Sequence, residues 1–205
     1  MCNLKSQMPL TRIAFPLAVV ALVVGHFAPW AQPAAAALTL SAHELAIFTN
    51  YTPYAGVFFN EGYLLPLWAA ALMCAAGARR RFLPAALAAL LWLLALPGYP
   101  ELRNLTSGQG SEFMLQLVTC VVFLPLGVWL GGRTNPGPVV LRAAAGAGLL
   151  AALTSTVGFL VVRAVAIEPL FGVPVALGWG WWCTVAGAVL CLAAIAFAGS
   201  LHSRP

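Results

Sequence analysis

The chain has 205 residues, of which 62% are apolar and only 7% are charged, and its mean hydropathy is +0.93. A soluble domain carries about 25% charged residues, so this chain has too little charge to cover a surface that faces water. The net charge of +5 comes from basic residues scattered at the ends of apolar segments, without the basic stripe of a nucleic-acid-binding protein. The composition therefore predicts a single membrane domain over residues 1–205, with the lipid bilayer as its main partner and no nucleic acid.

Six apolar segments follow one another along the chain, separated by charged residues, prolines and glycines. Each approaches the roughly 20 residues that a helix needs to cross the hydrocarbon layer, and helices satisfy their backbone groups internally in lipid. We therefore expect an all-α fold, a polytopic transmembrane helix bundle of six spans. The predicted spans are Ile13–Trp30, Gly62–Ala78, Phe82–Gly98, Phe113–Gly132, Ala143–Val162 and Val175–Gly199.

The first apolar segment has an alternative interpretation. It has a basic start, an apolar middle and a run of small residues at its end, as a cleavable signal peptide does. Cleavage would leave five spans and place the new amino terminus outside.

The distribution of Lys and Arg predicts the orientation. With the amino terminus in the cytoplasm, eight of the ten basic residues lie inside and only Arg103 and Arg163 lie outside, as the positive-inside rule requires. We therefore expect a multi-pass protein of a bacterial inner membrane with both termini in the cytoplasm. All five acidic residues then lie on the outer side: Glu44, Glu61, Glu101, Glu112 and Glu168.

The longest loop, residues 31–61, lies on the outer side and contains a helix signal. It begins with the run Gln32–Ala37, which we expect to be flexible. Ser41 followed by Glu44 and then by apolar residues forms a capping box, which predicts a short helix from Ser41 to about Thr49. This helix is too short to span, so we expect it to lie at the interface and to fold back over the bundle, with His43 or Glu44 near Glu61 and Arg163.

The fifth predicted span has small residues at every fourth position, and such a face permits close helix contact within the bundle or between protomers. A homo-oligomer through this span, or contact with other membrane subunits, is therefore expected. The face consists of Ala144, Gly148, Ala152 and Thr156.

Ionisable residues on the outer side form the candidate functional site, because ionisable groups at membrane depth are costly and often functional. Glu61 and Arg163 are expected to pair across the bundle. No metal ion and no cofactor is assigned to this candidate polar cluster from the sequence. Its members are His26, His43, Glu44, Glu61, Glu101, Arg103 and Arg163.

Sequence motifs do not specify a reaction, since the common hydrolase, metalloprotease and nucleotide-binding signatures are missing. The segment Phe123–Gly127 resembles the Phe-x-Pro-x-Gly helix of VanZ-like membrane proteins over one span, and no family is assigned from it. The first functional hypothesis is a non-catalytic protein, either a small permease-type component or an accessory subunit of a membrane complex. The second is a membrane enzyme with an outer His/Glu/Arg site, with a metal ion as one option.

Overall fold

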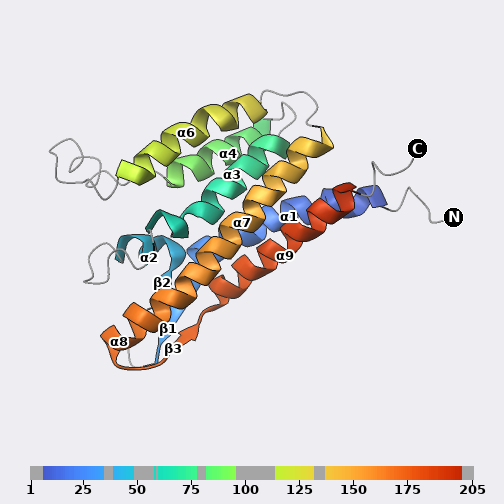
Figure 1. Ribbon diagram of the computed structural model, residues 1–205. Helices are drawn as coiled ribbons and strands as arrows, with labels where there is room; N and C mark the ends of the chain where they lie inside the picture. Colours follow the sequence, from blue (N-terminus) through green and yellow to red (C-terminus); the bar gives the residue numbers. More distant parts are fainter. Residues whose placement is uncertain are drawn as a thin grey trace.

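The fold is an elongated bundle of helices with a small sheet at one end (Figure 1). The computed structural model describes residues 7–34, 39–48, 58, 60–77, 82–95, 114–131 and 137–199. Glu101, Arg103 and Glu112 lie outside these residues, as does the predicted helix end at Thr49.

The helical elements follow the predicted segments in chain order. They are α1 (Gln7–Phe27), α2 (Ala42–Phe48), η3 (Asn60–Tyr63), α3 (Leu65–Gly77), α4 (Phe82–Leu94), α6 (Met114–Gly131), α7 (Pro138–Val162), η5 (Arg163–Ile167), α8 (Glu168–Phe171) and α9 (Trp179–Gly199). The strands are β1 (Pro29–Pro33), β2 (Leu40–Ser41) and β3 (Val175–Leu177). Here η3 is a 3-10 helix and η5 is a single turn of π-helix.

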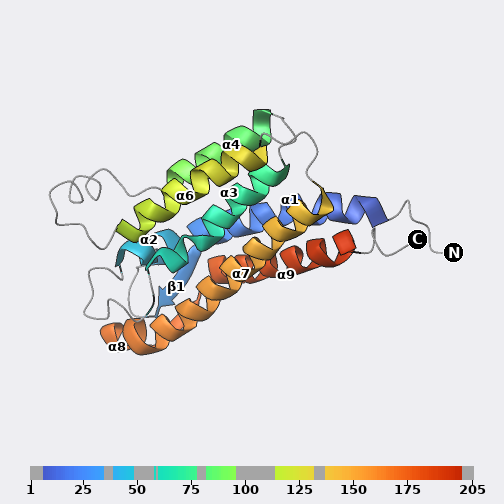
Figure 2. The same ribbon diagram turned by 45° about the horizontal axis from the view of Figure 1, so that its top comes forward.

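The long helices run roughly along the bundle axis, and α3 contacts helices on both of its sides. It packs against α1 and α7 on one side and against α4 and α6 on the other, while α9 packs against α1 and α7. Figures 1 and 2 show the first turn of α1 and the last turn of α9 at one end of the bundle. The opposite end, which we call the sheet end, holds α2, α8 and the three strands.

Two helical stretches among the described residues are long and apolar enough to cross a membrane: Pro138–Phe171 and Trp179–Phe197, with 34 and 19 residues. The apolar parts Ile13–Phe27, Leu65–Gly77 and Leu83–Leu94 are shorter. A helix of 13 residues such as α4 extends only about 20 Å, less than the roughly 30 Å of hydrocarbon. The helical fold is therefore confirmed, and the number of six spans is not.

The prediction of an all-α fold was incomplete, because a three-stranded antiparallel sheet joins distant parts of the chain. Its order is β2-β1-β3, and β1 pairs with β3 through Ala31–Leu177, Gln32–Ala176 and Pro33–Val175. The Gly178 amide also donates to the Trp30 carbonyl at 2.8 Å. The run beginning at Gln32, expected to be flexible, thus begins inside a strand.

The sheet also corrects the boundaries of the first and last predicted spans. Helix α1 ends at Phe27 rather than Trp30, because Pro29 has no amide hydrogen to continue the helical ladder and the chain turns into β1. Helix α9 starts at Trp179 rather than Val175, since Val175–Leu177 pairs with β1. Apolar composition could not separate these strand residues from the adjoining helices.

The small face of α7 is buried within the chain, which confirms the prediction of close helix contact. Ala144, Gly148, Ala152 and Thr156 are all buried. A Cβ atom added at Gly148 would lie 2.9 Å from the Cys191 Sγ, 3.0 Å from the Met73 Sδ and 3.6 Å from a Leu22 methyl carbon. Helices α1, α3, α7 and α9 therefore meet at this glycine. Association with other subunits stays a proposal, and it would need a different face of α7.

Helix α1 and helix α9 approach each other at a second glycine contact, which the sequence analysis did not identify. A Cβ atom on Gly25 would lie 2.9 Å from the Thr184 amide nitrogen and 3.0 Å from the Gly180 carbonyl oxygen. These are backbone atoms, which cannot move aside as a side chain can. The crossing of α1 and α9 thus depends on glycine at this position.

Gly148→Ala should destabilise the bundle, because the new methyl group would contact two sulfur atoms more closely than packed carbon atoms normally do. Overpacking of this kind costs about 1–3 kcal/mol. Gly146→Ala is the matched control on the same helix, since a Cβ atom there meets nothing within 4 Å and alanine is the better helix former by roughly 1 kcal/mol. Thermal unfolding of the purified variants should give a lower midpoint for Gly148→Ala only; equal midpoints would contradict this packing.

Candidate functional site

The capping box at Ser41 is present in the structure and starts helix α2. The Glu44 amide donates to the Ser41 Oγ at 3.2 Å, and the Ser41 amide donates to the Glu44 Oε2 at 2.7 Å. The Ser41 hydroxyl also donates to the same carboxylate oxygen at 2.8 Å. These reciprocal bonds are those of a capping box, so the predicted helix start is confirmed. Ser41 also ends β2, and the cap therefore joins the sheet to the helix.

Helix α2 folds back over the sheet end of the bundle, as expected. It contacts η3 and the end of α1. This places His43 in the first turn of α2 beside His26 in the last turn of α1, with ring centroids 5.6 Å apart and ring planes at 75°. The sequence analysis put both histidines in the candidate polar cluster and did not predict that they pair with each other.

The His26 side chain is fully buried, at 0% exposure. Among the residues that the structure describes, neither of its ring nitrogens has a hydrogen-bond partner, and the buried Nδ1 of His43 has none. The Tyr63 backbone lies near the His26 ring but not in hydrogen-bonding geometry. A buried polar group without a partner costs about 1–3 kcal/mol, so this histidine pair is energetically unusual.

The pKa values of His43 and Glu44, the half-buried and the exposed ionisable residue of α2, are shifted by different causes. Burial lowers the pKa of His43, while the neighbouring Glu44 carboxylate acts in the opposite direction. The pKa of Glu44 is lowered mainly by the hydrogen bonds that it accepts from the backbone and the side chain of Ser41. His43 is therefore held neutral near pH 7, and Glu44 is held as a carboxylate.

Arg163 lies in the π-helical turn η5 and pairs with a glutamate that was not its predicted partner. Its Nε donates to the Glu168 Oε1 at 2.8 Å, and the Val175 amide donates to the same oxygen at 3.3 Å. Glu168 thus connects η5 to β3. Only the backbone of Glu61, in η3, belongs to the described part of the chain, so its predicted pairing with Arg163 stays a prediction.

Aromatic side chains pack around the sheet end of α1. Trp30 is fully buried, and its indole NH donates to the Gly25 carbonyl at 2.6 Å. Its ring packs edge-on against Phe159 and Tyr63, with centroids 5.5 and 6.3 Å apart. The Tyr63 hydroxyl is buried and has no partner among the described residues. The sequence analysis missed Tyr63 because a tyrosine near a span end is equally typical of an interfacial anchor.

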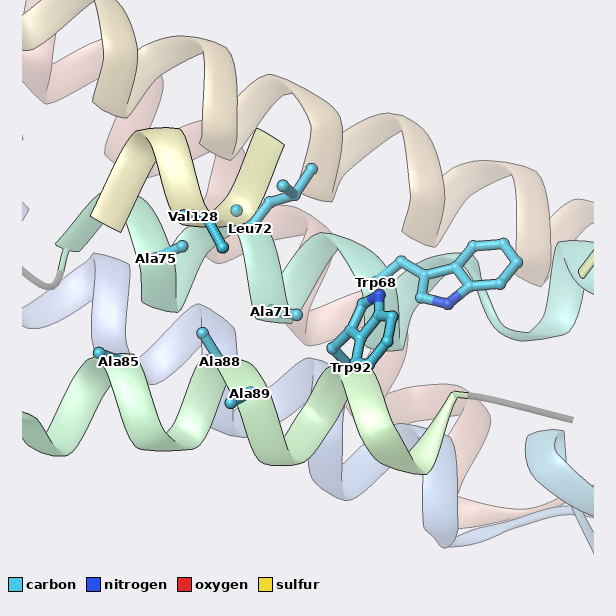
Figure 3. Close-up of a pocket in the computed structure, with 10 residues that line it drawn as sticks. Trp68, Ala71, Leu72, Ala75, Ala85, Ala88, Ala89, Trp92 and Val128 are labelled. Carbon is cyan, nitrogen blue, oxygen red and sulfur yellow. The ribbon is translucent and has the colours of Figure 1, made fainter. Parts of the chain in front are cut away.

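A separate apolar cavity of about 220 Å³ lies between α3, α4 and α6. Figure 3 shows short alanine side chains from α3 and α4 along it, and the indoles of Trp68 and Trp92 together at one end. No titratable residue lines it, so it offers space for an apolar group and no acid–base chemistry. Its lining consists of Trp68, Ala71, Leu72, Ala75, Ala85, Ala88, Ala89, Trp92, Gly127 and Val128.

Ser41→Ala should loosen α2, because it removes both the acceptor for the Glu44 amide and a donor to the Glu44 carboxylate. Loss of such a cap costs about 1 kcal/mol. Ser41→Thr is the matched control, since threonine retains the hydroxyl. Hydrogen exchange of the α2 amides should be faster in Ser41→Ala and nearly unchanged in Ser41→Thr. Equal protection in all three proteins would show that the cap does not stabilise the helix.

The chain matches no protein-family model, no curated protein and no solved structure. A proposal for its function therefore rests on its own residues and their geometry.

Proposed function

We propose that this chain is a multi-pass integral membrane protein of six spans, with both termini in the cytoplasm and the sheet end on the outer side. The observation that carries the proposal is the placement of apolar and polar side chains on the long helices. Large apolar side chains face outward, whereas the hydroxyl side chains of Ser155, Thr156 and Thr184 are buried inside the bundle.

The outward apolar residues form continuous stripes rather than isolated exposures. On α1 they recur with the period of one helix face, and similar stripes run along α4, α7 and α9. A soluble monomer rarely exposes an apolar patch larger than a few hundred Å², so lipid is the solvent that suits these faces. The α1 stripe consists of Ile13, Leu17, Val20, Val24 and Phe27.

The inward polar residues make structural hydrogen bonds inside the bundle. The hydroxyl of Ser155 donates to the Gly62 carbonyl, and that of Thr156 donates to the Ala152 carbonyl at 2.7 Å. The indole NH of Trp181 donates to the Thr156 carbonyl at 3.2 Å. The bonds of Ser155 and Trp181 link η3 and α9 to α7, as polar residues do between transmembrane helices.

The distribution of basic residues supports this orientation. Arg163 is one of the two basic residues that the positive-inside rule assigns to the outside, and it lies in η5 at the sheet end. Reporter fusions after Arg80, Gly108 and Arg204 test the orientation. We expect cytoplasmic activity at Arg80 and Arg204 and outer activity at Gly108. The fusion after Arg80 is the decisive one. Reporter activity on the outer side of the membrane at this position would contradict the six-span arrangement.

Within the membrane, we propose a non-catalytic role as a small permease-type component or an accessory subunit of a larger complex. Two of the four side chains of the candidate cluster that the structure describes have structural partners: Glu44 caps α2 and Arg163 pairs with Glu168. These assignments leave few groups for acid–base catalysis. The apolar stripes supply surface for contact with other membrane subunits as well as with lipid.

A second candidate function is a membrane enzyme with its site on the outer side. The pairing of His26 and His43 favours it, because two neutral imidazoles with unpartnered nitrogens could act on a bound ligand. The other described members of the candidate polar cluster do not converge on this pair through any ion pair or hydrogen bond. The non-catalytic role therefore has more support.

Purification of the tagged chain from native membranes in mild detergent distinguishes the two functions. We expect a membrane partner to accompany it at a constant ratio through two different separations, because the apolar faces of a subunit are partly covered by its complex. The same tag on an unrelated membrane protein of similar size is the control for adventitious association. A chain that purifies alone as a monomer would contradict the accessory role.

A further inference from the structure

The separation of the two histidine rings is compatible with two ligands for one metal ion. In tetrahedral coordination, with metal–nitrogen distances of about 2.0–2.1 Å, two imidazole centroids lie roughly 5 to 6 Å apart. The separation of 5.6 Å between His26 and His43 falls in this range. Their ring planes, inclined at 75°, are not stacked, and stacked rings could not both direct a nitrogen at one ion.

The unpartnered nitrogens point to a bound group as well. Buried polar atoms in folded proteins almost always have a partner, yet both nitrogens of His26 and the Nδ1 of His43 have none among the described residues. Imidazole binds zinc and copper ions well when it is neutral. The His26 side chain is fully buried, and the His43 side chain is half-buried.

We propose that His26 and His43 bind one divalent transition-metal ion of the zinc or copper type at the sheet end of the bundle. Each histidine supplies one ring nitrogen. Among the described residues no group of three or more His, Cys, Asp or Glu side chains gathers around an ion. With two ligands from the described part of the chain, the ion keeps coordination positions for further ligands, as in metal sites that leave a position open.

The surroundings of the pair suit an ion held by neutral ligands. Phe27 lies edge-on to His26 with centroids 4.8 Å apart and its ring centroid is 5.9 Å from that of His43, so an aromatic ring borders both histidines. Glu44, the residue after His43, has its carboxylate held by the cap at Ser41. This carboxylate supplies a negative charge next to one of the two proposed ligands.

Equilibrium dialysis against Zn²⁺ alone tests the proposal. The full-length protein in detergent is treated with a chelator before the dialysis. We expect about one zinc ion per chain for the unaltered protein, and an affinity lower by at least about tenfold for His26→Gln and for His43→Gln. His202→Gln is the matched control, since His202 is the third histidine of the chain and lies outside the described residues. Its affinity for zinc should not change.

Electron paramagnetic resonance with Cu²⁺ alone provides an independent readout at the ligands. We expect hyperfine coupling to two imidazole nitrogens in the unaltered protein and to one in His43→Gln. This variant is used because His43 is only half-buried, so its replacement disturbs folding less than replacement of the buried His26. Circular dichroism of each variant checks that the helices are retained. Zinc binding that persists in the variant that carries both His26→Gln and His43→Gln would overturn the proposal, as would a copper spectrum without imidazole coupling in the folded protein.

Discussion

The close approach of four helices at Gly148 is the contact on which the rest of the bundle depends. A Cβ atom there would lie close to sulfur atoms from α3 and α9 and to a methyl carbon from α1, so a larger residue would force these packed side chains to move. In the membrane location that we propose, helices gain little from burying apolar surface and associate through close packing and interhelical hydrogen bonds. The small residues above and below Gly148 extend this close packing along α7.

The sheet has a comparable importance for the sheet end of the bundle. By pairing β1 with β3 it joins the chain just after α1 to the chain just before α9, and by pairing β1 with β2 it brings α2 back toward α1. The capping box then starts α2 directly at the end of β2. Each of these steps is local, and together they bring His43 beside His26.

The bundle separates two kinds of polar group. Ser155, Thr156 and Trp181 make interhelical or backbone hydrogen bonds within the bundle, and their role in packing is complete. The histidine pair differs from them, because its buried nitrogens lack partners among the described residues. The histidine pair is therefore the place for a bound ligand, which is compatible with either an accessory or a catalytic role.

The sequence by itself determined the helical character, the helix start at Ser41 and the small face of α7, because periodicity, capping residues and residue size are local properties. Tertiary structure decided where α1 ends and α9 begins, since Val175–Leu177 is apolar in either state and becomes a strand only when β1 is beside it. It also decided the partners of the charged and polar residues. Arg163 pairs with Glu168, five residues further along the chain, and the ring of His26 in α1 packs beside the ring of His43 in α2. Residue type can indicate that such groups need partners, but the choice among them depends on distances that exist only after the helices pack.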